Sequence, residues 1–208
     1  MTGSEEILKK IKSGATGVMF LGLTLTLLPT IIIICMIISG SFAGNVLLVV
    51  ILILCALVGA VVMAYNMKIM LNPMSSLFIK KNPDILSEAD ELTSNIVYRD
   101  SFLLFSNRLI ANAHDIRQIS YTDEVFVVYV YIHKTNGVVD MKQLKLETAR
   151  RTISINIYSK KDDEIDQLIG NILQNCRYAR VGYNDDSMAY LKKMRDIWKQ
   201  DQERRKGS

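Results

Sequence analysis

The chain of 208 residues has few of the residues that hold small secreted or metal-binding proteins together. It contains three cysteines and two histidines. Secreted scaffolds are stabilised by many disulfides, and zinc sites use closely spaced Cys and His. Cys35 and Cys55 lie in strongly apolar segments, and Cys176 is the single cysteine of the polar part. This excludes a disulfide framework and gives no pattern for a metal site.

Charged residues are missing from one long stretch. From Ser13 to Met67 the chain has no Asp, Glu, Lys, Arg or His, and a run of turn-forming residues divides this stretch in two. Each half is long enough to cross a bilayer as a helix, because ~20 residues at a rise of 1.5 Å span the ~30 Å hydrocarbon core. We therefore predict transmembrane helices at 16–38 and 46–66, joined by an extracytoplasmic turn at 39–45.

Other interpretations of this stretch fit poorly. A cleaved signal peptide has an apolar region of roughly 7 to 15 residues, whereas the first run here is longer and a second run follows it closely. A helical hairpin buried in a soluble globule would be expected to carry some charge over such a length. The uneven charge also excludes a disordered chain. The spans contain none of the ionisable residues that mark a transport path.

Lysine residues flank the charge-free stretch on both sides, whereas the turn has none. Because basic residues are retained on the cytoplasmic side, we expect a cytoplasmic N-terminus at 1–15, a cytoplasmic polar part and a two-span protein of the cell membrane. The same lysines are expected either to contact anionic lipid, at about 1 kcal/mol each, or only to set the topology. They are Lys9, Lys10, Lys12, Lys68, Lys80 and Lys81.

Small residues recur at every fourth position in both apolar runs. Such residues let helix backbones approach closely in a membrane, so they predict that the two spans pack along these faces. The same surfaces allow an oligomer through the transmembrane helices. The expected contact residues are Gly22, Thr26 and Thr30 on the first helix and Ala56, Ala60 and Ala64 on the second.

The polar part alternates between helix and strand patterns. Residues 67–82 form an amphipathic juxtamembrane linker, and Asn-Pro-Asp at 82–84 is typical of a helix start, which predicts a helix at 83–94. Two further helices are expected after residue 162 and residue 184, followed by a basic disordered tail at 201–208. Runs of β-branched and aromatic residues predict about seven strands in an antiparallel meander. These runs are 96–98, 102–105, 108–112, 116–121, 125–134, 138–145 and 152–158.

These elements predict one cytoplasmic α+β domain at 83–200. Ile165, Leu168 and Ile172 repeat at helical spacing, so their helix is expected to pack across the sheet. The segment Val125–Ile132 is apolar throughout. It is either a strand covered on both faces or a strand that faces a partner.

The order of the elements resembles a known type of protein. A two-span hairpin and a helix are followed by a meander containing IRQISYTDEVFVVYVYIHKTNG, the helix DDEIDQLIGNIL and the segment VGYNDDSMAYLKK. This order resembles small bacterial two-pass membrane proteins of unknown function, over roughly residues 15 to 198. The resemblance implies a cytoplasmic pleckstrin-homology-like (PH-like) domain, an antiparallel meander or partial barrel with a capping helix. It supplies no catalytic residue, and the chain departs from it by extra helices before and after the sheet.

Residues typical of catalysis or cofactor binding are isolated in this sequence. His114 and His133 have no ligand at metal-binding spacing, and no glycine-rich phosphate loop or nucleophile motif occurs. From Lys68 onward 22 basic residues stand against 19 acidic ones, too small an excess to indicate nucleic-acid binding. We therefore expect no enzyme activity, metal, cofactor or nucleic-acid partner. Four arginines form either a phosphate-binding patch or ordinary solvated surface: Arg150, Arg151, Arg177 and Arg180.

Two functional hypotheses follow from this sequence. In the first, the hairpin anchors a non-enzymatic interaction module whose PH-like domain binds a protein partner or membrane lipid at the cytoplasmic face. The all-apolar segment Val125–Ile132 favours this hypothesis. In the alternative, the chain is an immunity or self-protection protein that uses its spans against a membrane-active toxin. That role would explain why a small protein devotes so much of its length to bare apolar helices.

Overall fold

The computed structural model describes residues 2–41 and 45–207 and contains two compact units. The helical unit runs from Glu5 to Asp84. The sheet unit begins at Ile85, takes in the rest of the described chain, and also includes Thr2–Ser4. The first residues of the chain therefore belong to the sheet unit, although their helix continues into the helical unit.

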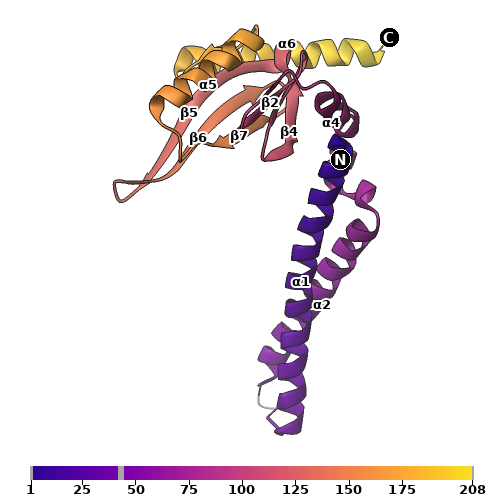
Figure 1. Cartoon of the computed structure of the whole chain (residues 1–208). Helices are drawn as coiled ribbons and strands as arrows, with labels where there is room; N and C mark the ends of the chain where they lie inside the picture. Colours follow the sequence, from indigo (N-terminus) through magenta and orange to yellow (C-terminus); the bar gives the residue numbers. More distant parts are fainter. Residues whose placement is uncertain (1, 42–44, 208) are drawn as a thin grey trace. The chain divides into compact units, whose positions relative to one another are not determined.

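Two long helices make up most of the helical unit (Figure 1). Helix α1 spans Gly3–Ile38 and helix α2 spans Val46–Leu71. Both predicted apolar spans are thus helical, and α1 begins well before the span expected at residue 16. Residues 42–44 of the expected turn lie outside the described residues. Helix α2 continues past the expected end of its span at residue 66 and takes up the first part of the expected linker. A 3₁₀ turn, η2 at Pro73–Ser75, and the short helix α3 at Leu77–Lys81 follow in that linker.

The sheet unit starts with helix α4, Ile85–Ser94, two residues later than predicted. A four-stranded antiparallel sheet follows in the order β1-β2-β3-β4. Its strands are β1 (Tyr98–Arg99), β2 (Leu103–Phe105), β3 (Leu109–Asn112) and β4 (Asp115–Tyr121).

A second four-stranded sheet has the order β7-β6-β5-β8. The prediction of one continuous antiparallel meander was wrong in two respects. The chain breaks the ladder between β4 and β5 with a 3₁₀ turn, η3 at Thr122–Glu124, and β8 pairs parallel with β5, which makes this sheet mixed. Its strands are β5 (Val125–Thr135), β6 (Val138–Thr148), β7 (Thr152–Asn156) and β8 (Arg180–Val181).

The main core lies between both sheets and helix α5, Asp162–Asn175. Ile165, Leu168 and Ile172 of α5 are nearly or fully buried in the same cluster as side chains from β2, β3, β5, β6 and β7. The helical spacing of these residues places them on one face, and their apolar surface is removed from water against the sheets. The expectation that this helix packs across the sheet is confirmed.

A second, smaller core covers the opposite face of β5. Helix α6, Asp185–Gly207, contributes Leu191, with Met194 and Trp198 beside it, and packs against Phe126 and Val127. The first half of β5 is therefore covered on both faces, which explains why Val125–Val128 are all apolar. Helix α6 also continues through the segment expected as a disordered tail, where good helix formers and an Asp201–Arg204 pair at i,i+3 favour the helix.

Side chains join the two sheets where their edges approach. The Ser154 N–H of β7 donates to the Gln118 side chain at 2.7 Å, and the Asn112 amide donates to the Ser154 carbonyl oxygen at 2.8 Å. The two side-chain amides thus provide hydrogen-bond partners for the main chain of β7 along the edge that does not pair with β6. The sheets are thus linked by side chains at this seam.

The start of α1 is capped by helix α4, which lies some ninety residues later in the sequence. The Ser4 N–H donates to the Asp90 carboxylate at 2.8 Å, and the Gly3 N–H donates to the Thr93 hydroxyl at 3.1 Å. A helix N-terminus favours such acceptors, especially a carboxylate. A side chain at Gly3 would overlap the Ala89 backbone, so glycine allows this close approach.

Candidate membrane anchor

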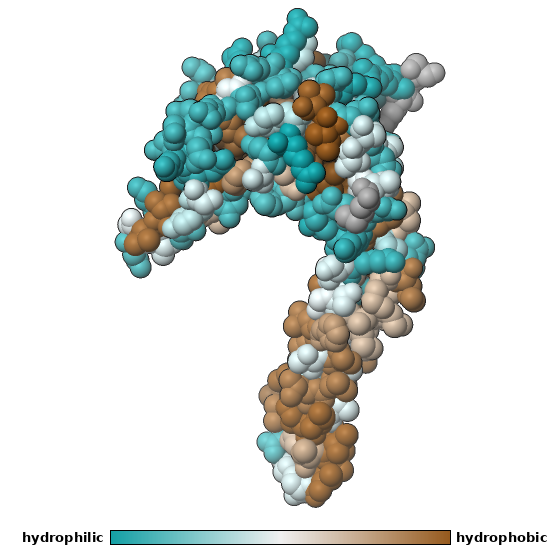
Figure 2. Space-filling view, in the orientation of Figure 1, coloured by the Kyte–Doolittle hydropathy of each residue, from teal (hydrophilic) through white to brown (hydrophobic). Residues whose placement is uncertain are grey.

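The apolar surface of α1 and α2 is mostly open. Of the most apolar 18-residue windows, 17% is buried in α1 and 11% in α2. A core helix of a water-soluble domain would be mostly buried, whereas these helices present hydrophobic residues over most of their surface (Figure 2). Both are long and apolar enough to cross a membrane.

The two helices approach each other most closely at a pair of glycines. A Cβ placed on Gly59 would lie 2.6 Å from the Thr26 hydroxyl oxygen and 2.8 Å from the Gly22 carbonyl oxygen. A Cβ on Gly22 would lie 2.9 Å from the Met63 nitrogen. Because these separations leave no room for a side chain, glycine sets how near the two backbones come.

The structure brings part of the predicted small-residue faces together. Gly22 is buried, and Thr26, Ala56 and Ala60 are half-buried, whereas Thr30 and Ala64 are exposed. The Thr26 and Thr30 hydroxyls donate to carbonyl oxygens of their own helix, those of Gly22 and Thr26.

Sequence reasoning missed Gly59, which is buried in the helix pair. The signal was present as a seven-residue spacing. Ala15, Gly22 and Pro29 are buried at intervals of seven on α1, and Gly59 and Asn66 on α2. Such a spacing is typical of helices that cross at a shallow angle, and a strict four-residue spacing drifts off the contact face.

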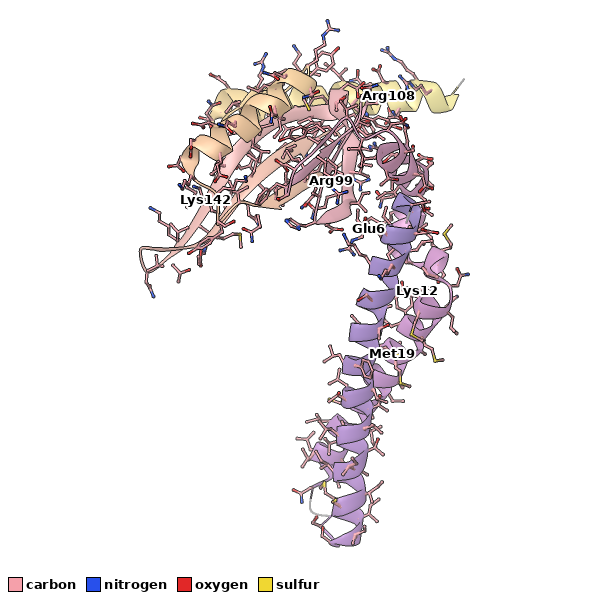
Figure 3. The ribbon with its side chains drawn as sticks, viewed as in Figure 1. Glu6, Lys12, Met19, Arg99, Arg108 and Lys142 are labelled. Carbon is pink, nitrogen blue, oxygen red and sulfur yellow. The ribbon has the colours of Figure 1, made fainter. Side chains whose placement is uncertain are left out.

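The lysines expected at the membrane surface all lie in the helical unit. Lys9, Lys12, Lys68, Lys80 and Lys81 are exposed, and Lys10 is half-buried in an i,i+4 pair with Glu6 at 2.8 Å. Figure 3 shows Lys12 on α1 between Glu6 and Met19. These lysines cap the apolar part of the pair at the end where α1 begins and α2 ends.

The end of α2 and the segment after it are amphipathic. Leu71, Met74 and Leu77 are strongly exposed, at 74%, 51% and 59%, while Ile79 is buried. The exposed apolar side chains therefore stand beside Lys80 and Lys81 on one short stretch of chain. Apolar residues next to lysines are typical of segments that lie in a membrane interface.

In the sheet unit, Glu88, its most buried charged residue, belongs to a network around Arg150. Its guanidinium contacts the Glu88 carboxylate at 2.9 Å and the Glu124 carboxylate at 2.8 Å. Glu88 is almost fully buried, and the Trp198 indole N–H donates to Glu124 at 3.1 Å. The network ties α4, η3 and α6 to the turn between β6 and β7.

A second network fixes α6 on β6. Arg195 donates to the Glu147 carboxylate at 3.0 Å and to the Thr148 carbonyl oxygen at 2.9 Å. The Tyr129 hydroxyl also donates to Glu147, and burial together with this carboxylate raises the pKa of Tyr129 to about 12. Both networks hold helices in place.

The four arginines, for which a phosphate-binding patch and ordinary surface were both possible, make contacts within the chain. Arg150 is used in its internal network, and the Arg151 guanidinium donates to the Arg117 carbonyl oxygen at 3.0 Å. Arg177 and Arg180 lie over tyrosine rings, with Arg180 3.8 Å from the centre of Tyr190.

Two open clefts lie on the sheet unit. One, of about 610 Å³, is lined by residues that include Arg108, Tyr121, Trp198 and Asp201. The other, of about 600 Å³, includes Phe102, His114 and Tyr158. Both are wide surface depressions whose polar residues belong in part to the internal contacts described above.

Candidate catalytic groups stand apart from one another. Burial raises the pKa of the Cys176 thiol to about 12, which keeps it protonated at neutral pH. His133 pairs with Asp140 at 2.8 Å on the exposed β5–β6 hairpin, and His114 contacts the Phe102 ring edge to face. Within residues 2–41 and 45–207, no three His, Cys, Asp or Glu side chains gather as they would around a metal ion.

No family model, curated protein or solved structure matches this chain.

Proposed function

We propose that this protein is a non-enzymatic, membrane-anchored interaction module. Helices α1 and α2 form a two-span anchor with both chain termini in the cytoplasm, and the sheet unit binds a protein partner or lipid headgroups at that face. The observation that carries the proposal is the open apolar surface of the helix pair, which has no charged residue from Ser13 to Met67. Lysines at one end of this pair support the orientation.

The fold of the sheet unit supports a PH-like domain. Four antiparallel strands are followed by three more antiparallel strands and by α5, whose buried face shares one core with both sheets. This arrangement supports the partial barrel with a capping helix that the resemblance implies. Helices α4 and α6 and strand β8 are additions to that plan, and α6 covers β5 from outside.

Membrane extraction tests the anchor. The full chain should stay in the membrane pellet after alkaline carbonate washing. Leu28→Lys with Leu54→Lys, at exposed positions in the two apolar runs, should release it, since each lysine costs about 2.5 to 3.5 kcal/mol at the centre of a span. Release of the unsubstituted chain would contradict the proposal.

A second test separates lipid contact from topology. A chain beginning at Lys68 should bind acidic vesicles more than neutral ones, and salt should weaken the binding by screening. Lys80→Gln with Lys81→Gln should weaken it about thirtyfold, on an estimate of ~1 kcal/mol per charge. If this chain ignores acidic vesicles at low salt, these lysines serve topology and the sheet unit binds a protein.

A further inference from the structure

Strand β5 leaves one of its edges without a neighbour over its second half. β8 pairs with β5 at Val127 and Val128, and the Gly182 N–H closes this contact on the Val128 carbonyl oxygen at 2.9 Å. Past Val128, no strand of the described chain lies along this edge. β5 continues to Thr135 paired with β6 alone, and the two strands project as a long hairpin (Figure 1).

The alternation of the strand shows which main-chain groups face the open edge. The N–H and C=O of one residue point to the same edge, and those of the next residue point to the other edge. Since the Val128 carbonyl faces β8, Val130 and Ile132 present their main-chain groups to the open side. Tyr131 and His133 turn theirs toward β6, opposite Gln143 and Met141.

Side chains along this edge do little to protect it. Sheet edges are usually guarded by charges, proline, a bulge or a covering loop. Here no charged residue occurs from Val125 to Ile132, and Tyr131 and Ile132 are 40% and 48% exposed. Beyond Val127, the β5–β6 ladder has no register shift until after His133, and the first lysine is Lys134. Such an edge is suited to pairing with another strand.

We propose that this edge of β5 pairs antiparallel with the same edge of a second copy of the chain. The β7-β6-β5-β8 sheets of the two copies would then continue across a two-fold axis at Ile132 or His133. Both copies use one surface, so the contact closes on itself as a dimer. Main-chain groups of Val130 and Ile132 on each copy would gain hydrogen-bond partners.

The charges near the axis fit a second copy. If the axis passes through Ile132 or His133, Lys134 lies opposite Val130 or Ile132 of the other copy, both uncharged. An axis at Tyr131 would place Lys134 opposite Val128, whose edge is occupied by β8. His133 already has Asp140 of its own chain as a partner at 2.8 Å. Like charges directly opposite each other destabilise a sheet, and this pairing avoids them.

This pairing rests on the proposed function in one respect. Anchoring holds both copies in the plane of one membrane and raises their effective concentration, so a short strand contact is enough to join them.

Disulfide trapping of the full chain in membrane vesicles tests the pairing. Cys35 and Cys55 are replaced by alanine, buried Cys176 is kept, and single cysteines are placed at Tyr131, Ile132 or His133. In an antiparallel self-pairing, a residue whose main-chain groups face the open edge lies opposite another such residue. The two-fold axis therefore passes through one residue, which lies opposite the same residue of the second copy. Its Cα separation of roughly 4.5 to 5.5 Å allows a disulfide. We expect a disulfide-linked dimer from at least one variant.

Two controls make the result specific. Leu173→Cys on α5, which is 40% exposed, should give no dimer. In the Tyr131→Cys and His133→Cys chains, Ile132→Pro removes one outward N–H per copy while leaving the bonds to β6. It should weaken association about thirtyfold through the two lost hydrogen bonds. Ile132→Thr keeps the N–H and should retain the dimer.

The outcomes separate this inference from the proposed function. The pairing is overturned if the chains pellet with the vesicles but cross-link no better than Leu173→Cys. It is also overturned if adding Ile132→Pro leaves the amount of cross-linked dimer unchanged. Either result leaves the anchor in place. A cross-link to a different protein also overturns it. Chains that wash out of the membrane overturn the anchor, and with it the basis of the pairing.

Discussion

Arg150 shows how a single residue can hold the fold together through contacts that the sequence does not reveal. In the sequence Arg150 is one of two adjacent arginines in a turn, a typical surface position. In the structure it joins Glu88 and Glu124, which lie 62 and 26 residues away. Pairing over such separations leaves no local pattern, so neither the burial of Glu88 nor its partner could be predicted.

Arg150→Met should destabilise the sheet unit by about 3 kcal/mol, because it leaves the buried Glu88 carboxylate without its counter-charge. The measurement is the denaturant dependence of the sheet unit's unfolding. Arg108→Met, at a 70% exposed side chain paired with Glu91 at 3.8 Å, is the matched control and should cost less than about 1 kcal/mol. Equal effects of the two substitutions would contradict a structural role for the Arg150 network.

Cys176 should make stability depend on alkaline pH. Burial raises the pKa of its thiol from 9.0 to about 12, so the folded chain holds the proton over a range in which the unfolded chain loses it. The stabilisation is complete below pH 9 and is lost as the pH rises toward 12, by at most about 1.4 kcal/mol per pH unit. Stability curves at pH 8 to 10.5 should fall more steeply for the native chain than for Cys176→Ala. Parallel curves would show that the thiol is not buried in this way.

At the scale of elements, periodic hydrophobic patterns predicted which helices and strands form, but they did not predict how the edges of the sheets pair. The two apolar helices, strands β5 and β6, and α5 were predicted because each has a strong local signal. The break between β4 and β5 and the parallel pairing of β8 were missed. Val181 and its neighbours form a two-residue strand, too short to carry a period, and their partner lies more than fifty residues earlier.

Gly59→Leu should separate α1 from α2, because even a Cβ at this position would overlap Thr26 and the Gly22 carbonyl. Spin labels at the exposed residues Leu21 and Val61 would report the change as a longer inter-label distance in the membrane. Ala64→Leu, on an exposed position of the same helix, should leave the distance unchanged. If both variants behave alike, the helices do not pack through this glycine pair.

Leu168→Asp should abolish cooperative unfolding of the sheet unit. Leu168 is 2% exposed in the main core, and an unpaired carboxylate there costs several kcal/mol against a typical total of roughly 5 to 15 kcal/mol. Leu173→Asp changes a 40% exposed residue of the same helix and should have little effect. A cooperative melt retained by Leu168→Asp would mean that α5 does not cover the sheets.

For the whole molecule, the division into an apolar hairpin and a polar α+β part followed directly from the distribution of charge. The capping of α1 by Asp90 and Thr93 could not be predicted from that distribution, because the whole apolar hairpin separates these residues from the start of α1 in the sequence. The apolar run in β5 was correctly linked to coverage on both faces, but only for Val125–Val128. Its continuation at Tyr131 and Ile132 is exposed, and it is where we propose that a second copy pairs.

The central claim is a two-span anchor with both termini on the cytoplasmic side. Single cysteines at Ser41, beside the turn, and at Ser159, an exposed position in the sheet unit, test it in a chain whose native cysteines are replaced. In intact cells a membrane-impermeant maleimide should label Ser41→Cys, and it should label Ser159→Cys only after permeabilisation. Labelling of Ser159→Cys in intact cells, or protection of Ser41→Cys, would contradict this topology.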